Sequence, residues 1–536
     1  MTAAQDRLQT RLATLKEAGR HRAPARPGLG EIALHLAEED PQRIVISDAR
    51  RDVTRAQMVD MARRLGGALL DRGIAPGAVI AFQLPNWWEA CVINMTAALF
   101  GYRILPLLPI YRAAELGVIL PECGVRAVFV PPADKRVDYR ALISGIDGAP
   151  EHVFTVRGDG SDGPAFDPLL AHDPAAPRLP APEDAKMIIF TSGSTGRPKG
   201  VIHTHASLDA VVRDTAAFWD LDSSDVMYVP SPISHIGGSI YAFEFPWISG
   251  CRTILEDHWD PDRAVARIDA EGVTFMAGAT PFLKGLLAAS AQAGTRLTGL
   301  RRFICGGASV PPDLVQQALE RFPNAVVSRA YGSTEVPLAC PGIRDRASAM
   351  ARTDTDGEVE VEVRLLEETG GEGEIAFRGP NMFIGYLDPE HDAGNFTPDG
   401  FFLMGDMGRV IDDRFITITG RKKDIIIRKG ENISPLEIEN ALMSHPDVAA
   451  VALVGAPEPE RGEMVVAFLV PAPGATFGMA EMTAHLSGCG FARQKFPERL
   501  EIVEALPMNT VGKVQKPELR QIAARLVAQD MGPNTS

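Results

Sequence analysis

The sequence predicts a layered α/β protein that carries a smaller α+β domain at its C-terminal end. Between residues 41 and 130, short apolar runs alternate with segments whose apolar residues recur at helical spacing. Such alternation is typical of sheets covered by helices. Short strand-like runs separated by glycine turns follow at residues 359–386. We therefore expect a large, multi-subdomain N-terminal domain of layered α/β sheets with a small β subdomain, and a smaller α+β C-terminal domain, the lid.

The first predicted elements precede residue 187. Strands are expected at 43–47, 78–84, 104–108 and 127–130, and helices at 53–72, 88–99 and 115–120. Residues 131–186 are rich in Pro, Asp and Gly, which predicts an irregular surface connection. The most apolar stretch, residues 90–110, contains Asn94, Thr96 and Arg103. We interpret it as a buried helix followed by a strand rather than a membrane span.

The later elements continue the alternation. Strands are expected at 226–229, 275–278, 302–305, 359–366, 373–378, 382–386, 448–454, 463–470 and 499–503, and helices at 207–218, 435–444 and 479–487. Ser434, Pro435 and Glu437 match the N-cap, the first helical position and the capping box of the helix at 435–444. The domain boundary is predicted near residue 421, which gives domains of residues 1–421 and 422–536.

Bulk composition excludes several classes of protein. Of the 536 residues, 45% are hydrophobic and 23% charged, as in soluble globular proteins. A net charge of −15 argues against a nucleic-acid binder. The six cysteines are scattered, which predicts buried free thiols in a reducing compartment. The N-terminal residues are amphipathic and lack the apolar core of a signal peptide, so we expect a cytoplasmic protein. His203 and His205 have no third ligand nearby and do not predict a metal site.

An anion-binding loop is predicted after the apolar run at residues 187–190. Its small and hydroxylated residues are Thr191, Ser192, Gly193, Ser194, Thr195 and Gly196. Backbone N–H groups and hydroxyls of such a loop turn toward one point, which suits a polyphosphate. Lys199 adds a mobile positive charge. The spacing differs from the common P-loop, Gly-x-x-x-x-Gly-Lys-Ser/Thr.

A second group of polar residues follows the predicted strands further along the chain. Tyr331 can stack on an adenine face, Thr334 can donate to a phosphate, and Glu335 supplies a carboxylate for Mg²⁺. The glycines around residues 306–307 permit close approach of a purine. Asp406 can accept charge-assisted hydrogen bonds from ribose hydroxyls.

Several strings resemble, in the same order, the motifs of the adenylate-forming superfamily, which includes acyl-CoA synthetases, peptide-synthetase adenylation domains and luciferases. They are TSGSTGRPKG at 191–200, CGGAS at 305–309, AYGSTE at 330–335, GFFLMGD at 400–406, ITGRKKDIII at 418–427 and PMNTVGKVQK at 507–516. Residues 109–120 most resemble CoA ligases of short- to medium-chain and alicyclic acids.

The resemblance implies two half-reactions. A carboxylate attacks the α-phosphate of Mg·ATP, giving acyl-adenylate and pyrophosphate. The thiol of CoA then attacks the acyl carbon and releases AMP. ATP, Mg²⁺ and coenzyme A are therefore the implied cofactors, and the implied partner is a small carboxylic acid. Rotation of the lid about a hinge would separate the two steps.

The resemblance also implies roles for individual residues. Catalytic residues would be Lys513, Thr334, Glu335, His235 and Lys199, with Glu335 also holding the metal ion. Nucleotide contacts would come from residues 191–196 and from Gly307, Ala308, Ser309, Ala330, Tyr331, Gly332, Ser333, Asp406, Ile418 and Arg421. The acid pocket would contain His235, Ile236, Gly237 and Gly238. Lys423 would be the hinge, and Lys429, Gly430 and Glu431 would lie on the CoA path.

Two positions depart from the family pattern, and alternatives stay open. Arg329 stands where many relatives have Asn, and Met508-Asn509 where relatives often have Arg-Thr. The protein could instead load the phosphopantetheine of a separate carrier protein, or be a non-catalytic nucleotide-binding homologue. A homodimer is also left open. Small residues after His235, without an adjacent acidic residue, favour an uncharged aliphatic, alicyclic or aryl acid over an amino acid.

Overall fold

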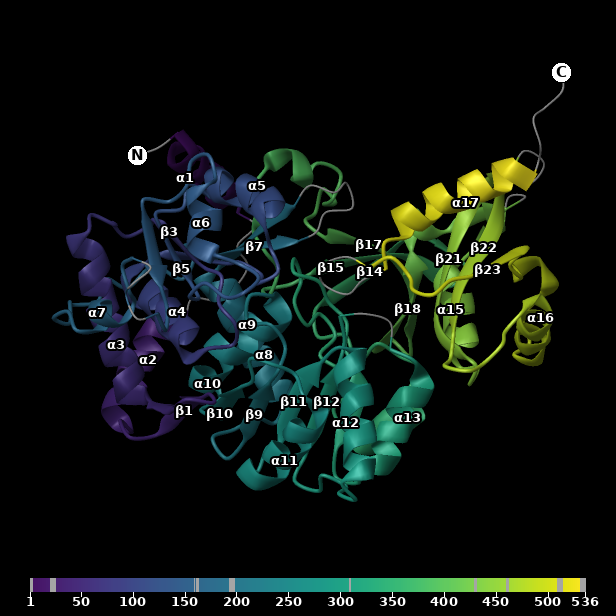
Figure 1. The fold of residues 1–536 in the computed structure, drawn as a ribbon, viewed down its shortest axis with the longest axis horizontal. Coiled ribbons are helices and arrows are strands. Elements are labelled where there is room, and N and C mark those ends of the chain that lie inside the picture. The colour runs from purple at the N-terminus through teal and green to yellow at the C-terminus, as the bar shows by residue number, and fades with distance from the viewer. Residues whose placement is uncertain are drawn as a thin grey trace.

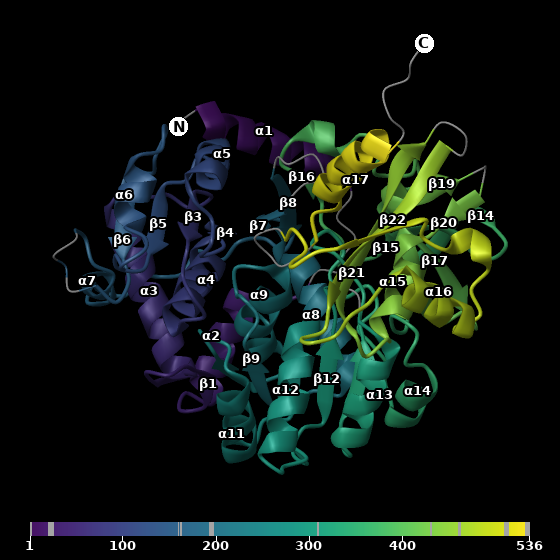
Figure 2. The same ribbon diagram turned by 45° about the vertical axis from the view of Figure 1, so that its right-hand side comes forward.

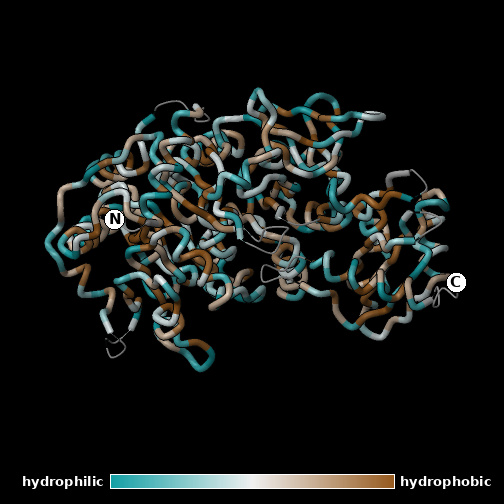
Figure 3. Tube along the Cα trace, turned by 90° about the horizontal axis from the view of Figure 1, so that it is seen from above, coloured by the Kyte–Doolittle hydropathy of each residue, from teal (hydrophilic) through white to brown (hydrophobic). Residues whose placement is uncertain are grey.

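The computed structural model describes residues 3–19, 26–158, 160, 163–191, 198–307, 310–428, 431–458, 462–508 and 514–530. A large N-terminal domain occupies one end of the molecule and a smaller C-terminal domain the other (Figure 1). Seen from above, hydrophobic segments run through the interior of both parts (Figure 3). The predicted division into a large α/β domain and a small α+β domain is confirmed.

The first large sheet has the strand order β13-β12-β11-β9-β10-β1-β2. Its strands are β1 (Ile44–Ser47), β2 (Asp52–Thr54), β9 (Val226–Val229), β10 (Arg252–Leu255), β11 (Phe275–Gly278), β12 (Arg302–Cys305) and β13 (Val326–Arg329). Neighbouring strands are parallel except β1 and β2. Their short Val, Ile and Phe runs suit a sheet buried on both faces.

The second large sheet has the order β16-β8-β7-β4-β3-β5-β6. Its strands are β3 (Val79–Phe82), β4 (Arg103–Pro106), β5 (Ala127–Val130), β6 (His152–Thr155), β7 (Ala185–Thr191), β8 (Lys199–Thr204) and β16 (Gly385–Tyr386). β7 and β8 are antiparallel, and Thr191 pairs with Lys199. The apolar run at residues 187–190, expected before the phosphate loop, is therefore part of β7.

Helices cover both faces of both sheets. They are α1 (Ala3–Glu17), α2 (Leu29–Glu39), α3 (Arg55–Asp71), α4 (Trp88–Phe100), α5 (Ala113–Cys123), α6 (Tyr139–Ser144), α7 (Asp167–Leu170), α8 (His205–Trp219), α9 (Ile236–Phe243), α10 (Phe245–Ile248), α11 (Pro261–Glu271), α12 (Thr280–Gln292), α13 (Pro312–Arg321) and α14 (Arg346–Ala351). α2, α3, α4, α8, α9 and α10 pack between the sheets, with α11–α14 outside the first and α1, α5 and α6 outside the second. The large domain is thus five layers thick.

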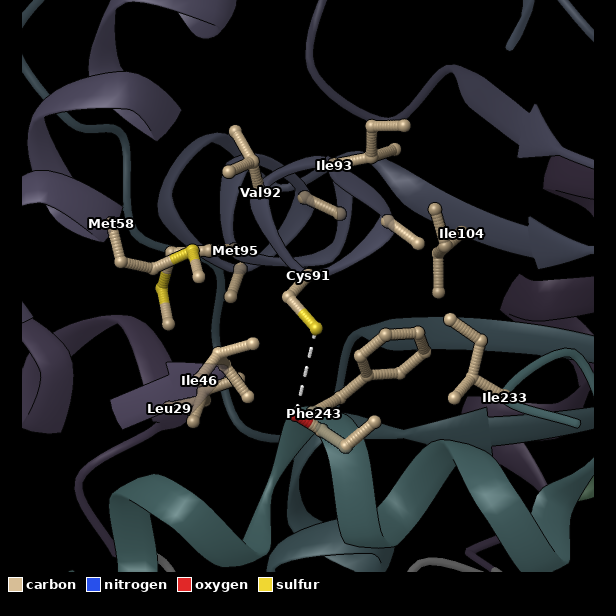
Figure 4. Close-up of a cluster of buried hydrophobic side chains, with 14 of the residues drawn as sticks. Leu29, Ile46, Met58, Cys91, Val92, Ile93, Met95, Ile104, Ile233 and Phe243 are labelled. Carbon is tan, nitrogen blue, oxygen red and sulfur yellow. Dashed lines mark hydrogen bonds between the residues drawn. The ribbon is translucent and has the colours of Figure 1, made fainter. Parts of the chain in front are cut away.

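The core between the sheets joins segments far apart in the sequence. Cys91 of α4 faces Phe243 of α9, with Leu29 and Ile46 beside it (Figure 4). The Cys91 Sγ lies 3.8 Å from the carbonyl oxygen of Ala242. Burial is the main cause that raises the pKa of the Cys91 thiol, so this cysteine acts as a small apolar side chain.

Two smaller sheets follow. The first, β14-β15-β17-β18, contains β14 (Glu362–Thr369), β15 (Glu372–Arg378), β17 (Phe402–Ile411) and β18 (Phe415–Arg421). The second contains β19 (Ile426–Arg428), β20 (Glu431–Ile433), β21 (Val448–Glu458), β22 (Gly462–Pro471) and β23 (Arg499–Ile502), and α15 (Pro435–Met443), α16 (Met479–Gly488) and α17 (Lys516–Asp530) pack on it. A short 3₁₀ turn, η2 (Lys422–Asp424), connects the two sheets.

The structure corrects three local predictions. Residues 131–186 are not an irregular connection, because they contain α6, β6 and α7 and the start of β7. In the predicted strand 382–386 only Gly385–Tyr386 is paired, and it joins β8 rather than the small β subdomain. Ser434 is the N-cap of α15 but forms no capping box, because its hydroxyl donates to the Thr419 carbonyl instead.

The cysteine prediction holds with one exception. All six cysteines are free, and five are buried, but Cys489 is exposed. Within the described ranges, no helix is both long enough and apolar enough to cross a membrane.

Candidate active site

Several of the predicted site residues lie beyond one edge of the first large sheet. In a parallel sheet the loops after the carboxyl ends of neighbouring strands lie side by side, and ligands bind there. β9, β11, β12 and β13 are such neighbours, and Gly278, Cys305 and Arg329 stand in register at their ends. The loops beyond them carry His235, Gly307 and residues 330–335. Strand order therefore brings together motifs that lie about 100 residues apart in the sequence.

Tyr331, Asp406 and Arg421 form the first half of the site. The Tyr331 hydroxyl donates to Oδ2 of Asp406, and Nε of Arg421 lies 2.6 Å from Oδ1 of Asp406. Asp406 and Arg421 stand opposite each other on β17 and β18. Burial first, and then Asp406, raises the pKa of Tyr331, so its phenol stays a neutral donor. The three residues predicted to bind adenine and ribose are thus in contact.

Arg329, the departure from the family pattern, has a defined structural role. Its Nε donates to Oδ1 of Asp356 at 2.9 Å, and its Nη1 donates to the Asp354 carbonyl at 3.1 Å. The other carboxylate oxygen of Asp356 accepts the backbone N–H of Ile418 at 2.8 Å. Arg329 therefore supports β18, the strand that carries Ile418 and Arg421.

Glu335, Tyr386 and Lys199 form the second half of the site. The Tyr386 hydroxyl donates to Oε1 of Glu335 at 2.7 Å. Lys199 Nζ lies 5.4 Å from the centre of the Tyr386 ring. Among the described residues, no group donates to Oε2 of the half-buried Glu335. This carboxylate fits Mg²⁺, which takes few protein carboxylates and completes its octahedron with phosphates and water.

Thr334 lies between the two halves and is held by a buried histidine. Nε2 of His203 donates to the Thr334 carbonyl at 2.7 Å, which fixes the tautomer because a carbonyl only accepts. The His203 Nδ1 lies 3.1 Å from the Ser207 hydroxyl. Burial lowers the pKa of His203 to about 4. His203 is thus a neutral support of the turn at residues 330–335.

The segment that carries His235 is held by a buried amide from the other large sheet. The side-chain N–H₂ group of Asn86 donates to the carbonyls of Val229, Ser231 and Glu256 at 3.1, 2.9 and 3.0 Å. Its oxygen accepts the backbone N–H of Ile233 at 3.0 Å. All hydrogen-bonding positions of this amide but one lone pair are used, so the path of residues 229–233 is fixed.

His235 begins α9. It is the N-cap residue, and its Nδ1 accepts the backbone N–H of Gly237 at 3.2 Å. Ile236 and Gly238 are buried, whereas Gly237 is exposed. A Cβ on Gly238 would lie 2.2 Å from the Pro232 carbonyl oxygen, so only glycine fits there. The four predicted pocket residues thus form the N-cap and first turn of α9.

A buried ion pair anchors the other end of α9. Lys186 of β7 contacts Glu244, the residue after α9, with side-chain exposures of 1% and 3%. Burial first, and then Lys186, lowers the pKa of His205 well below its usual range, so His205 is neutral. The pair links α9 to the strand that enters the phosphate loop.

The hinge prediction falls on η2. Lys423 is exposed, but partial desolvation by its neighbours is the main cause that lowers its pKa. Neighbouring Lys422 pairs with Glu374 at 2.7 Å and with Glu367 at 2.9 Å. On the opposite side, Arg520 of α17 pairs with Asp424. The turn is therefore tied to both the small β sheet and the C-terminal domain.

Further predicted nucleotide residues have local structural reasons for their identity. Gly307 has a φ of +86°, which favours glycine. A Cβ on Gly332 would lie 2.7 Å from the Val336 oxygen. The Ser333 hydroxyl accepts the backbone N–H of Glu335 at 3.2 Å, and Ala330 donates its N–H to the Cys305 carbonyl. Thr191 ends β7.

Part of the predicted site lies outside the described residues. This part comprises Ser192, Gly193, Ser194, Thr195, Gly196, Ala308, Ser309, Lys429, Gly430 and Lys513. The backbone of Glu431 is described, as the first residue of β20. In the described ranges, no group of three or more His, Cys, Asp or Glu residues could hold a metal ion. A magnesium ion here would therefore depend on Glu335 and the phosphates of its nucleotide.

Sequence reasoning missed four supporting residues: Asn86, His203, Asp356 and Tyr386. Asn86 and Tyr386 act across more than 50 residues, and no local pattern announces such contacts. His203 follows the apolar run Val201-Ile202, which is a usable signal because a polar group in a buried strand needs a partner. Asp356 stands among other polar residues and gives no such signal.

Comparisons with known proteins identify the family of the chain. The chain belongs to the AMP-binding enzyme family: the family model for the AMP-binding enzyme matches residues 34–387, and the model for the AMP-binding enzyme C-terminal domain matches residues 437–513.

Individual relatives cover nearly the whole chain. A medium-chain fatty-acid–CoA ligase of Escherichia coli is 33% identical over 520 residues, covering 94% of this chain and 92% of the relative. An indoleacetate–CoA ligase of Aromatoleum aromaticum is 29% identical, covering 91% and 96%. The solved structure of ATP-bound MatB from Rhodopseudomonas palustris matches with a TM-score of 0.81 and 27% identity, covering 93% of this chain and 99% of that one.

Proposed function

We propose that this protein is an ATP-dependent acid–CoA ligase. It activates a carboxylic acid as an acyl-adenylate with release of pyrophosphate, and then transfers the acyl group to coenzyme A with release of AMP. The observation that carries the proposal is the pair of arrangements on either side of Thr334. One has Asp406 and Arg421 beside Tyr331, and the other has Glu335 and Lys199 beside Tyr386.

The arrangement suits adenylate formation because two anions must meet. Lys199 brings positive charge from the base of the phosphate loop, and Thr334 is suited to donate to the α-phosphate. Asp406 and Arg421 would hold the ribose, and Tyr331 the adenine. Mg²⁺, when held by Glu335, would offset the negative charge of the phosphates. His235 and the glycines of its turn would form the wall of the acid pocket.

The proposal also assigns a separate function to each of the two domains. Residues 1–421 would bind ATP and the acid, and residues 422–536 would be a lid carrying the catalytic Lys513. The turn η2 with Lys423 would be the hinge, and residues 429–431 would border the CoA path. The ties of Lys422 and Arg520 to opposite sides of η2 support a pivot there. The segment that follows β23 extends toward the large domain (Figures 1 and 2).

The decisive experiment measures both half-reactions with a panel of acids. We expect acid-dependent release of pyrophosphate from ATP, followed by CoA-dependent release of AMP. Uncharged medium-chain, alicyclic or single-ring acids should be favoured. The relatives named as a medium-chain fatty-acid–CoA ligase and an indoleacetate–CoA ligase support this acid class. Turnover of long-chain acids alone would overturn the acid class, and absence of pyrophosphate release with every acid would overturn the function.

The hinge and the lysine are tested by separating the half-reactions. Lys513→Ala should slow adenylate formation about 10²–10³-fold, as for loss of one group that stabilises transition-state charge. It should affect thioester formation from supplied acyl-adenylate far less. Lys423→Pro should do the reverse, because a fixed φ at the hinge can block one arrangement. Equal losses in both steps for Lys513→Ala would contradict the two-arrangement proposal.

The identity of the thiol that accepts the acyl group is also part of the proposal. CoA is favoured over a carrier protein because the Escherichia coli and Aromatoleum aromaticum relatives are both named CoA ligases. Free CoA tested against a phosphopantetheine-loaded carrier decides between them. A cytoplasmic location and a homodimer remain predictions, checked by fractionation and by light scattering.

A further inference from the structure

We propose that the N-terminal helix α1 is a positioning element for the carboxylate of Glu335. Arg11 of α1 and Asp392 hold the backbone of Tyr386, and the Tyr386 hydroxyl holds Glu335. This inference rests on the proposed function, in which Glu335 binds Mg²⁺. Tyr386 and Arg11 act through Glu335 and are positioning residues rather than catalytic ones.

The first step is the contact between Tyr386 and Glu335. Besides the 2.7 Å hydrogen bond from the hydroxyl, the nearby Phe383 N–H donates to the Glu335 carbonyl at 2.8 Å. Tyr386 is 4% exposed. The two hydrogen bonds make both the side chain and the backbone of Glu335 depend on the segment 383–386.

The second step is the clamp on the Tyr386 backbone. Nε of Arg11 donates to the Tyr386 carbonyl at 2.9 Å, and its Nη2 pairs with Oδ2 of Asp392 at 2.6 Å. Oδ1 of Asp392 accepts the Tyr386 N–H at 2.9 Å. The Arg11 and Asp392 side chains are only 11% and 10% exposed. One ion pair thus holds both backbone groups of this tyrosine.

The third step is the close fit between α1 and the neighbour of Tyr386. Gly385 has a φ of +152°, and a Cβ there would lie 2.6 Å from Leu15 Cδ2 and 3.2 Å from Arg11 Nη2. Leu8, Arg11 and Leu15 recur at helical spacing, and both leucines are 2% exposed. α1 therefore docks through two apolar anchors with Arg11 between them.

The place of α1 in the chain separates it from the matched family region. That match begins at residue 34, whereas Tyr386 lies within it. In the second view α1, in purple, runs to the green segment beside β16 (Figure 2). The helix thus adds a clamp from outside the matched region to a residue that contacts the candidate metal site.

The test measures binding rather than turnover. The affinity of α,β-methylene-ATP is measured by calorimetry with Mg²⁺ and, separately, with EDTA, and the ratio gives the gain due to the metal. Tyr386→Phe should reduce this gain about 10–100-fold, as is typical for partners of a metal-binding group. Binding in EDTA should stay unchanged. Arg11→Met should reduce the same gain by a smaller factor, since the hydroxyl remains present.

Matched controls separate positioning from general stability. Tyr228→Phe removes the same kind of bond, a phenol donating to Glu256 Oε2 at 2.9 Å, in the other large sheet. Lys16→Met removes an exposed pair with Glu183 at 3.2 Å from the same helix α1. Neither control should change the metal-dependent gain, whatever its effect on the melting temperature.

The outcomes are distinct. An unchanged gain in Tyr386→Phe, or a loss in Arg11→Met no greater than in Lys16→Met, would overturn the proposal. Failure of the proposed function would show differently, as wild-type protein that releases no pyrophosphate with any acid. In that case the nucleotide titrations still decide whether α1 positions Glu335.

Discussion

Two tyrosine–carboxylate pairs flank the turn at residues 330–335, and they differ in charge. In the first, Tyr331 and Arg421 both contact Asp406, so a guanidinium balances the carboxylate. In the second, Glu335 accepts from Tyr386, and Lys199 faces the ring of that tyrosine. The first pair is suited to neutral hydroxyl groups, and the second keeps a negative charge that a metal ion can use.

The largest effect should come from the support beneath the first pair. Arg329→Met leaves the Asp356 carboxylate buried without its charge partner, which costs about 3–5 kcal/mol. Urea unfolding of the two proteins measures this loss. Arg126→Met is the control, because its pair with Glu151 is exposed and should contribute less than about 1 kcal/mol. Equal stability of both variants would mean that Asp356 finds another partner.

The next effect concerns the second pair. Glu335→Gln keeps the shape and the hydrogen bond from Tyr386 but removes the charge. Loss of metal stabilisation worth several kcal/mol should slow pyrophosphate release about 10²–10³-fold. Excess Mn²⁺ should recover part of the rate. A variant with unchanged rate and unchanged metal dependence would place the metal ion elsewhere.

A smaller effect is expected at Asp406. Asp406→Asn weakens charge-assisted hydrogen bonds worth about 1.5–3 kcal/mol, and so should weaken ATP binding by one to two decades. The dependence on Mg²⁺ should stay as in the wild type, in contrast to Glu335→Gln. Equilibrium binding of a fluorescent ATP analogue tests this. If the Mg²⁺ dependence of ATP binding changed in Asp406→Asn, the two tyrosine–carboxylate pairs would not have the separate roles proposed here for nucleotide and metal ion.

The most gradual effect is a pH dependence of the free energy of unfolding at His203, which supports the turn between the pairs. Burial lowers the pKa of His203 to about 4, against an unfolded value near 6.5. Between these values the unfolded chain binds the proton more strongly, so stability falls as the pH falls through this window. The slope from this group approaches about 1.4 kcal/mol per pH unit. His203→Gln should flatten it, leaving the part due to His205; an unchanged slope would contradict neutral burial.

Regular patterns made much of the fold predictable. The runs at 127–130, 226–229, 275–278 and 302–305 are strands with the predicted bounds, because each is a short apolar run bounded by breaks. β6 was missed because only Val153 and Phe154 of its residues are apolar and buried, within a stretch of Pro, Asp and Gly. The capping box at Ser434 failed because the Thr419 carbonyl competes for its hydroxyl.

In the candidate site, too, some residues could be predicted from the sequence and others could not. The residues expected to touch the nucleotide, such as Tyr331 and Asp406, stand in recognisable strings, and the structure brings them into contact. Their supports, such as Asn86 and Arg11, carry no local signal because their partners lie 143 and 375 residues away. Only the folded chain reveals which carbonyl a lone amide or guanidinium will meet.

The contact between Arg11 and Tyr386 has a consequence for the newly made chain. A ribosome adds roughly 5–20 residues per second, so the 375 residues between these partners take about 20–75 seconds to appear. During that interval α1 lacks its partner Tyr386, and while the last 51 residues are added Glu335 is present without the clamp. A nascent chain would therefore complete its metal-binding half only after most of the large domain has been translated, which delays any use of ATP by unfinished protein.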